Sequence, residues 1–415
     1  MRVHALVIAA CCSTCESSDC VEGAALWTDP PAGAYAVCGD LIVTGRRSEE
    51  MEVLRRLEVV EGSLVVEANP ELTEIPELPT LELIGGSLSI SDNPELSRIH
   101  GFPALVTVGG GLYVGENPAL TSLKLGDALT SVHSLFLALN PSMREFRSQL
   151  LAVEDDLTVA NNSSLEVLEM PGLIEVPRNF YITANLALQE LEFPALRGVG
   201  GAWYITDNAS LQALTGFPAL EHAAVIEVSG NADLRELTFA GSFTESISLL
   251  VYDNARLERL AGSPEVRLAD DTDVYVGSNP ALKAVDGFAA VIHLDRLAVD
   301  DNAQLAEIAG FTALTRVSSL EIIDNAVLTG PSGWFPELKN AERVSIYRNP
   351  SLPPSHVDEL LNHLTVEQIP RIGDNMGEDT ALDPCPWPSD SVCDALEPNG
   401  EGTGLCATDP EGCGV

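Results

Sequence analysis

The segment Leu88–Gly111 has the sequence LSISDNPELSRIHGFPALVTVGGG, and most of the chain consists of imperfect copies of it. With Asn93 as the origin, Leu88 and Ile90 alternate with serine residues, which is typical of a short β-strand. Pro94 predicts a turn, and apolar residues then mark two further short edges before the glycines turn the chain back. One copy therefore predicts one coil of a larger structure.

The asparagine at the origin recurs thirteen times, at spacings of 22 to 25 residues. A repeat of this length predicts a solenoid, in which each coil packs only on its neighbours and chain length measures the number of coils. Leu41–Arg46 resembles one more, degenerate coil in front, which gives about 14 coils. The corner asparagines are Asn69, Asn93, Asn117, Asn140, Asn162, Asn185, Asn208, Asn231, Asn254, Asn279, Asn302, Asn325 and Asn349.

Three columns of the repeat hold large apolar residues in every copy. They lie five residues before each asparagine, three before it and three after it, where the residue is leucine in every copy except Met143. Columns that never admit a charge are core columns, and burial of each large side chain contributes about 1.5 to 3 kcal/mol. The strand alternates with period two and is too short for a helix, so stacked copies predict a parallel sheet. The predicted fold class is all-β, a parallel β-helix or leucine-rich-repeat-like solenoid.

The corner asparagine is predicted to be structural. A turn leaves backbone N–H and C=O groups unpaired, and a buried amide side chain carries both the donors and the acceptors that satisfy them. In six copies proline follows, which disfavours the helical conformation for the asparagine and fixes the next φ. We therefore expect a ladder of stacked asparagines and not a ligand site.

The composition is strongly acidic, with 62 Asp and Glu against 22 Lys and Arg and a net charge of −40. Such a surface repels nucleic acids and anionic lipids, and it favours solubility and the binding of cations. We therefore expect no nucleic-acid partner.

Residues 1–19 are predicted to be a leader and linker. The mostly apolar Val3–Ala10 is followed by Cys11, which resembles a bacterial lipoprotein signal with Cys11 as the lipidated residue. Signal peptides usually have about 15 to 30 residues, which leaves open an upstream start, a remnant of a signal or an unprocessed apolar start. No later run approaches the roughly 18 apolar residues of a membrane helix. We expect an outer-membrane lipoprotein or a secreted protein, whose contact with a membrane is through a lipid anchor alone.

The nine cysteines lie at the two ends of the chain, and the repeats contain none. This clustering, together with the apolar leader, indicates an oxidising compartment and disulfides that staple the ends. If Cys11 carries a lipid, the other eight can all pair. A zinc site at Cys12 and Cys15 is disfavoured, because no second pair lies nearby.

The repeat, together with the segment Cys38–Gly45 (CGDLIVTG), resembles the receptor L domain, the leucine-rich β-helix of insulin- and EGF-receptor ectodomains. The resemblance covers residues 20–352. It implies a right-handed β-helix that binds and does not catalyse, and a disulfide between Cys20 and Cys38 that closes the first coil. The chain departs from the family by running about 14 coils without interruption and by lacking a kinase and a membrane helix. The scaffold therefore carries over, and the receptor function does not.

Residues 353–365 are predicted to form a capping helix after the last coil. Ser355 is the expected N-cap, and Asp358 and Glu359 are expected in the first turn. Spacings of three and four residues place on one face Val357, Leu360, Leu361 and Leu364. A metal role for His356 and His363 is disfavoured because the HExxH pattern is absent.

Residues 366–415 are predicted to be a linker and a small disulfide-rich tail. The segment Asp383–Val415 is too short and too loop-rich to bury a core without covalent links, so we expect two disulfides among Cys385, Cys393, Cys406 and Cys413. It resembles cysteine-rich tails of bacterial secreted proteins and, more distantly, calcium-binding Notch-type repeats. Ca²⁺ takes six to eight oxygen ligands. Two interpretations stay open for three acidic residues of the tail, ligation of calcium and plain solvation. These residues are Asp390, Asp394 and Asp409.

Motifs of enzymes are nearly absent. The chain has no GxSxG, glycine-rich phosphate loop or HExxH motif. The alternative function is a β-helix polysaccharide lyase or hydrolase, which would need carboxylates clustered on adjacent coils, as in Asp300, Asp301 and Asp324. Acidic residues also precede the asparagine in other coils, however, so the position is generically acidic. We therefore expect a binding protein without a cofactor, other than the calcium considered for the tail.

The outward columns of the predicted sheet, four and two residues before each asparagine, concentrate the tyrosines. Strands favour aromatic residues on any half-exposed face, and neighbouring rings can simply cover one another. The functional hypothesis is an aromatic, acid-rimmed platform for a protein or polysaccharide at a cell surface, presented by a monomer. Small neighbours such as Gly115 and Gly277 would leave the rings accessible. The candidate residues are Tyr113, Phe136, Tyr181, Tyr204, Tyr252, Tyr275 and Tyr347.

Overall fold

The computed structural model describes residues 20–22, 32–214, 217–239, 243, 248–263, 265–330 and 334–375. The chain divides into two compact units, residues 1–224 and 225–415, each described by itself below. Several predicted sites lie outside the described residues: the lipidation site Cys11, the cysteines Cys385, Cys393, Cys406 and Cys413, and the calcium ligands Asp390, Asp394 and Asp409.

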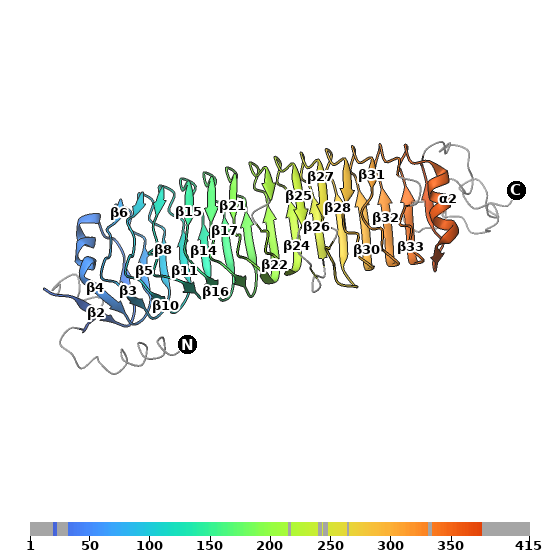
Figure 1. Ribbon diagram of the computed structural model, residues 1–415. Helices are drawn as coiled ribbons and strands as arrows, with labels where there is room; N and C mark the ends of the chain where they lie inside the picture. Colours follow the sequence, from blue (N-terminus) through green and yellow to red (C-terminus); the bar gives the residue numbers. More distant parts are fainter. Residues whose placement is uncertain are drawn as a thin grey trace, which may run out of the picture. The chain divides into compact units, whose positions relative to one another are not determined.

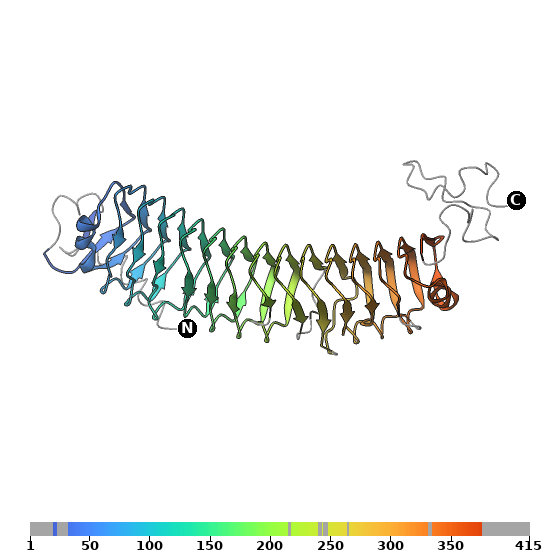
Figure 2. The ribbon, with the colours of Figure 1, turned by 90° about the horizontal axis from the view of Figure 1, so that it is seen from above.

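Each coil contributes one short strand to the main parallel sheet, and the strands of neighbouring coils lie side by side within each unit (Figures 1 and 2). In the first unit these strands are β3 (Leu41–Val43), β5 (Leu64–Glu67), β8 (Leu88–Ser91), β11 (Leu112–Gly115), β14 (Leu135–Ala138), β17 (Leu157–Ala160), β20 (Phe180–Thr183) and β22 (Gly198–Thr206). In the second unit they are β24 (His222–Ser229), whose first three residues belong to the first unit, β26 (Ser248–Tyr252), β28 (Asp273–Gly277), β30 (His293–Asp300), β32 (Arg316–Ile323), β33 (Asn340–Tyr347) and β35 (Arg371–Gly373).

The register of the main sheet keeps each repeat position in line. Leu112 lies opposite Leu88 on one side and Leu135 on the other, and both pairings are parallel. The same register holds in the second unit, where Val274 lies between Leu249 and Leu297. The predicted all-β parallel solenoid of about 14 coils is confirmed.

The second edge of the coils forms smaller parallel sheets. In the first unit these contain β6 (Glu74–Ile75), β9 (Arg98–Ile99) and β12 (Ser122–Leu123), and separately β15 (Glu145–Arg147), β18 (Val167–Glu169) and β21 (Glu190–Glu192), followed by β23 (Ala213–Leu214). In the second unit the strands are β25 (Glu236–Phe239), β27 (Arg259–Gly262), β29 (Ala284–Asp286) and β31 (Glu307–Ile308).

The third edge begins with the parallel sheet of β1 (Cys20–Glu22), β2 (Tyr35–Cys38), β4 (Leu57–Val60), β7 (Leu83–Ile84) and β10 (Thr107–Val108). It continues as β13 (Ser131–Val132), β16 (Ala152–Val153) and β19 (Glu175–Val176). In longer strands such as β30 and β32 the third edge runs directly into the main strand, because their pairing extends from His293 to Asp300. The second unit ends with β34 (Thr365–Val366), which pairs with the start of β33.

The core lies inside the coil and is built from the predicted columns. In β8, Leu88 and Ile90 are buried and the two serines between and after them are half-buried. The residue three after each asparagine is fully buried in every coil, Met143 included. The outward positions of the main strand therefore form the solvent face of the sheet.

The corner asparagines are fully buried and form the predicted ladder. The Nδ2 of Asn117 donates to the carbonyl of Ile90 in the preceding coil at 2.9 Å and to that of Gly115 in its own coil at 2.7 Å. Its Oδ1 accepts the backbone N–H of Asn93 at 3.2 Å. Each asparagine thus joins two coils at a corner that the sheet leaves unpaired.

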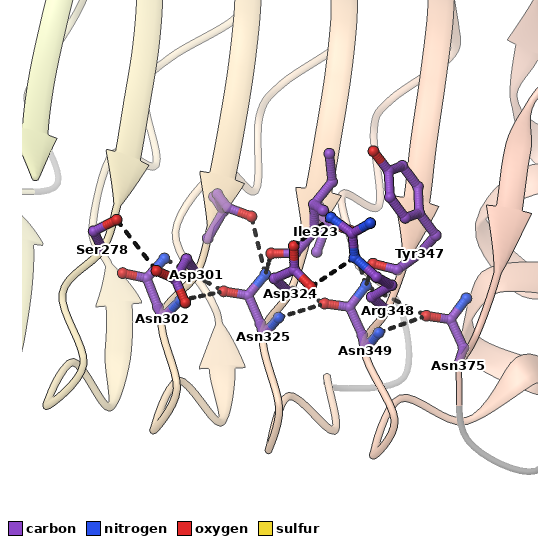
Figure 3. A network of polar contacts seen from close by, with 12 residues as sticks. Ser278, Asp301, Asn302, Ile323, Asp324, Asn325, Tyr347, Arg348, Asn349 and Asn375 are labelled. Carbon is purple, nitrogen blue, oxygen red and sulfur yellow. Dashed lines mark hydrogen bonds and ion pairs between the residues drawn. The ribbon is translucent and has the colours of Figure 1, made fainter. Parts of the chain in front are cut away.

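The ladder continues past the last coil predicted from the sequence. The backbone N–H of Asn349 donates to Oδ1 of Asn375 at 3.2 Å (Figure 3). The strand before it, β35, pairs with β33 in the register of the other coils. The solenoid therefore extends to Asn375, and the expected boundaries after residues 352 and 365 fall within its last coil.

A helix occupies part of a coil near each end of the described chain. The 3₁₀ helix η2 (Ser48–Arg56) follows the degenerate first corner and buries Met51 and Leu54. The helix α2 (Pro354–His363) lies in the last coil and buries Val357 and Leu360. The expected helix is therefore present, but it is inserted into a coil and does not follow the last one.

The start of α2 differs from the expectation. Pro353 is the N-cap residue and makes no side-chain cap, and the first turn contains no acidic residue, so Ser355 does not cap the helix. Proline is favoured at the first helical position because its missing N–H would be unpaired there in any case. Pro354 therefore starts this helix in place of a polar cap.

Candidate binding face of the main sheet

The aromatic residues predicted for the outer face of the main sheet do lie there. All seven are half-buried: Tyr113, Phe136, Tyr181, Tyr204, Tyr252, Tyr275 and Tyr347. The remaining tyrosine, Tyr35, is 1% exposed, and its hydroxyl donates to the carbonyl of Val53 at 3.0 Å. Burial raises the pKa of Tyr35 well above its ordinary value. Six of the seven tyrosines thus lie on this face, and Tyr35 lies in the core.

The first unit carries a continuous row of side chains on five successive coils. Tyr113 and Phe136 stack with ring centroids 4.5 Å apart and planes 1° from parallel. Tyr181 and Tyr204 lie 5.3 Å apart and are tilted by 60°. Thr158 lies between the two pairs, opposite Phe136 on one side and Tyr181 on the other. We call this set the aromatic row.

The small residues beside the rings do more than leave space. A Cβ added to Gly115 would lie 3.2 Å from Cε1 of Tyr113, and one added to Gly277 would lie 2.2 Å from the hydroxyl oxygen of Tyr275. These two rings therefore lie down on the glycines of their own strands. Each glycine is thus the surface on which a ring rests, and both rings stay half-buried.

The tyrosines of the second unit are surrounded by carboxylates. Tyr252 and Tyr275 have ring centroids 6.0 Å apart, and the hydroxyl of Tyr252 donates to Oε1 of Glu227 at 2.5 Å. This hydrogen bond, followed by burial, raises the pKa of Tyr252. Burial and the nearby charges of Asp300 and Asp253 raise the pKa of Tyr275. Both tyrosines therefore lose their hydroxyl proton less readily than an exposed tyrosine.

Two arginines of the second unit lie on tyrosine rings of this face. Arg296 lies 5.9 Å from the centroid of Tyr275 and donates to both carboxylate oxygens of Glu321 at 3.0 and 2.5 Å. Burial alone would raise the pKa of Glu321, but the hydrogen bonds from Arg296 and a serine lower it overall. The sequence suggested neither contact, since Tyr275 and Glu321 stand 21 and 25 residues from Arg296 and only the register brings them together.

The second arginine, Arg348, repeats this arrangement. Its guanidinium lies 4.9 Å from the centroid of Tyr347 and donates to both oxygens of Asp324 at 2.7 and 2.5 Å (Figure 3). A guanidinium that stacks on an aromatic ring while it donates two parallel hydrogen bonds is a strong and directional contact. The face thus holds an arginine twice against a ring and a carboxylate, once on the ring of the preceding coil and once on the ring of the adjacent residue.

The carboxylates considered for catalysis are brought together only in part. Asp324 is paired with Arg348, and Asp301 accepts a hydrogen bond from Ser278 at 3.3 Å (Figure 3). Asp300 lies apart from both bonds, and burial followed by the charges of Asp324 and Asp301 raises its pKa. Within the described residues no group of three His, Cys, Asp or Glu could hold a metal ion. The three aspartates therefore resemble a charged surface more than an acid and base pair.

The acidic residue before the asparagine has a conformational explanation. In nearly every coil that residue has a positive φ, for example 53° at Asp92, 57° at Asp253 and 56° at Asp324. This left-handed region disfavours most side chains, and aspartate and asparagine tolerate it because they bond locally to the backbone. The turn therefore favours aspartate in this column, although Leu139 and Arg348 adopt the same conformation, and the sequence alone did not indicate this conformation.

The structure also shows the surroundings of the two histidines of α2 and of the first predicted disulfide. Nδ1 of His356 lies 3.0 Å from the carbonyl oxygen of Thr329, and Nδ1 of His363 lies 2.7 Å from that of Glu359, so each ring is engaged with backbone. Cys38 is disulfide-bonded. Strand β1 lies beside β2, but the side chain of Cys20 is outside the described part, so the Cys20–Cys38 pairing stays a prediction.

A cleft of 480 Å³ in the first unit was not predicted. It lies where the second-edge sheet is interrupted between β12 and β15, and its charged lining residues are Glu77, His100, Lys124, Asp127, Glu145 and Arg147. The signal in the sequence is Gly126, which stands nine residues after its asparagine where the preceding coil has Phe102. The chain closes onto the carbonyl of Phe102, since a Cβ on Gly126 would lie 2.2 Å from it. Because residues of both charge signs line the cleft, the charges favour no particular class of ligand.

Comparisons with known proteins give little further guidance. No family model matches the chain, and no curated protein matches it. A crystal structure of a leucine-rich repeat protein from Bacteroides ovatus is similar, at 12% identity over 81% of this chain and 91% of that chain, with a TM-score of 0.28. At this TM-score the likeness adds nothing to the fold described above. Among the described residues, no helix has the length and apolar character needed to cross a membrane.

Proposed function

We propose that the protein is a non-catalytic recognition scaffold outside the cytoplasm, which presents the outer face of its main sheet to a protein or polysaccharide. The observation that carries this proposal is the aromatic row of the first unit, Tyr113, Phe136, Thr158, Tyr181 and Tyr204. Tyrosine offers rigid apolar area and a hydroxyl at little entropic cost, which is why it is frequent at binding surfaces.

The rigidity of the row supports this function. Its strands are tied by parallel pairing on both sides and by the asparagine ladder at their ends. A ligand therefore meets rings that are already in position, so that little conformational entropy is lost on binding. The resemblance to receptor L domains, which bind and do not catalyse, supports the same proposal, as do the leader and Cys11 for a place at the cell surface.

The test is the double substitution Tyr181→Ser and Tyr204→Ser. We expect the fold to stay intact, because both rings lie on the solvent face, and binding of the retained cell-surface polymer or protein to fall by tenfold or more, the effect of losing about 1.4 kcal/mol or more at an anchor residue. The measurement is pull-down from native surface material with circular dichroism as the folding check.

The matched control replaces two apolar residues that are exposed on other faces of the same unit, Ile174→Ser and Leu186→Ser, which are 48% and 52% exposed. These changes remove similar apolar area and are expected to leave retention unchanged. Equal retention by both variants would refute a role of the aromatic row. Release of unsaturated or reducing products from acidic or neutral glycans would instead favour the lyase or hydrolase.

A further inference from the structure

The second unit carries a surface that differs in chemistry from the aromatic row. Around Tyr252 and Tyr275 lie five carboxylates, and none of them forms an ion pair within the described part of the chain. Two arginines lie near them, and both are already paired, Arg296 with Glu321 and Arg348 with Asp324. We call this surface the tyrosine–acid patch, and it consists of Tyr252, Tyr275, Glu227, Asp253, Asp273, Asp300 and Asp301.

One carboxylate of the patch, that of Glu227, is fixed in position by hydrogen bonds to one of its two oxygens. Oε1 of Glu227 accepts hydrogen bonds from the hydroxyl of Tyr252 at 2.5 Å and from that of Ser229 at 3.0 Å. Oε2 of the same carboxylate receives no hydrogen bond from the described residues. Because Glu227 is fixed by two donors on one oxygen, the other is positioned to accept from outside without further loss of side-chain entropy.

The same face already binds guanidinium groups of its own chain. Arg296 lies over Tyr275 and Arg348 over Tyr347, and each donates two hydrogen bonds to a carboxylate of a neighbouring coil. In both cases the guanidinium stacks on a tyrosine ring, and the carboxylate fixes its orientation through two hydrogen bonds. Tyr252 offers a similar ring, and Glu227 and Asp253 offer carboxylates beside it. No arginine of the described chain lies over the Tyr252 ring.

From this geometry we propose that the tyrosine–acid patch binds an arginine-bearing segment of a partner protein. The inference rests on the proposed function, since it requires the main-sheet face to be a binding surface. Charge complementarity selects a cationic partner, because five unpaired carboxylates attract cations and repel acidic glycans. Tyrosine rings select arginine over lysine, because the planar and weakly hydrated guanidinium stacks on rings and donates in pairs.

The test uses two peptides of equal charge, acetylated and amidated Gly-Arg-Gly-Arg-Gly-Arg-Gly and its lysine counterpart, titrated into the full chain by calorimetry at about 0.15 M salt. We expect the arginine peptide to bind roughly threefold tighter or better, the effect of one or two exposed ring contacts. Tyr252→Leu should abolish this preference, because Tyr252 is the ring over which no arginine of the described chain lies. Tyr252→Phe should keep the preference, because phenylalanine retains the ring, while the affinity for both peptides falls with the loss of the hydroxyl that fixes Glu227. That fall keeps the test decisive if Tyr252→Leu disturbs the fold.

A matched pair of charge variants separates the patch from the overall charge. Asp253→Asn with Asp300→Asn should weaken the arginine peptide by about fivefold, whereas Glu265→Gln with Glu307→Gln, which removes the same charge from exposed residues off this face, should have little effect. Equal affinity for the two peptides, equal losses in the two charge variants, or no binding would each overturn the proposal. If the peptides fail while Tyr181→Ser with Tyr204→Ser still loses its ligand, the proposed function stands and this inference falls.

Discussion

At the scale of the residue, the molecule depends on one asparagine per coil. The side chain is the right length to reach the carbonyl two residues before it and the carbonyl of the preceding coil, as Asn254 does to Tyr252 and Val228 at 2.9 Å each. Its oxygen accepts the N–H of the previous asparagine, as Oδ1 of Asn254 does from Asn231 at 3.1 Å. Glutamine would be too long and aspartate lacks the donors. The repeat therefore admits asparagine alone at this corner.

The first stability prediction concerns this ladder. In Asn117→Ala the carbonyls of Ile90 and Gly115 and the N–H of Asn93 lose their side-chain partner in a fully buried place. We expect the free energy of unfolding to fall by about 1 to 3 kcal/mol. Chemical denaturation measures the change, with Asn362→Ala on the exposed side of α2 as the control. A change no larger than that of the control would show that water replaces the amide without cost.

At the scale of the element, each strand is too short to be stable alone and is held by its two neighbours. The helices η2 and α2 occupy the coils near the two ends of the described chain, where a coil lacks one neighbour. A helix satisfies its own backbone, so it closes a coil without offering an edge for further pairing. The apolar stripe of α2 was visible in the sequence, but its place inside the last coil was not, because Asn375 follows Asn349 at 26 residues.

We expect Leu360→Ala to destabilise the second unit by about 2 to 5 kcal/mol, because Leu360 is 1% exposed and its loss leaves a cavity beneath the helix. Hydrogen exchange of the β33 amides is the local readout, since this strand precedes α2 and pairs with the two strands that follow the helix, β34 and β35. The control is Glu359→Ala on the exposed side of the helix. Unchanged protection of β33 would mean that the helix does not support the last coil.

At the scale of the whole molecule, the dominant feature is the excess of acid, with a net charge of −40. Coils stacked in register bring carboxylates of successive repeats close together, since residues far apart in sequence share a column. The pKa of Asp300 shows the effect of these neighbours. Burial first, and then the charges of Asp324 and Asp301, raise this pKa above the ordinary 3.8. Solubility and cation binding are favoured by this charge, while the folded state carries some repulsion.

The sign of the pH effect follows from that shift. Folded Asp300 holds its proton more tightly than the unfolded chain, so its ionisation costs stability as pH rises from the ordinary aspartate value through the raised pKa. We therefore expect Asp300→Asn to raise the melting temperature at about pH 7, and this gain to vanish at about pH 3, where the wild-type carboxyl is protonated in both states. Asp92→Asn in the first unit is the control, and a gain that persists at pH 3 would contradict the assignment to charge.

The sequence by itself determined the coil. The asparagine period, the three apolar columns and the alternation of the strand were enough to predict the parallel solenoid, its inward and outward positions and the buried ladder, because each depends on residues within one repeat or on identical residues in the next. It also placed the tyrosines on the outer face. Tertiary structure alone decided what those tyrosines touch, since the ring of Tyr275 both rests on Gly277 of its own strand and carries Arg296 from the adjacent coil. The pairings of Arg296 with Glu321 and Arg348 with Asp324, the last coil that ends at Asn375 and the cleft at Gly126 arise between coils. A one-dimensional pattern repeats along the chain, whereas these contacts depend on how unlike residues of neighbouring repeats meet once the coils are stacked.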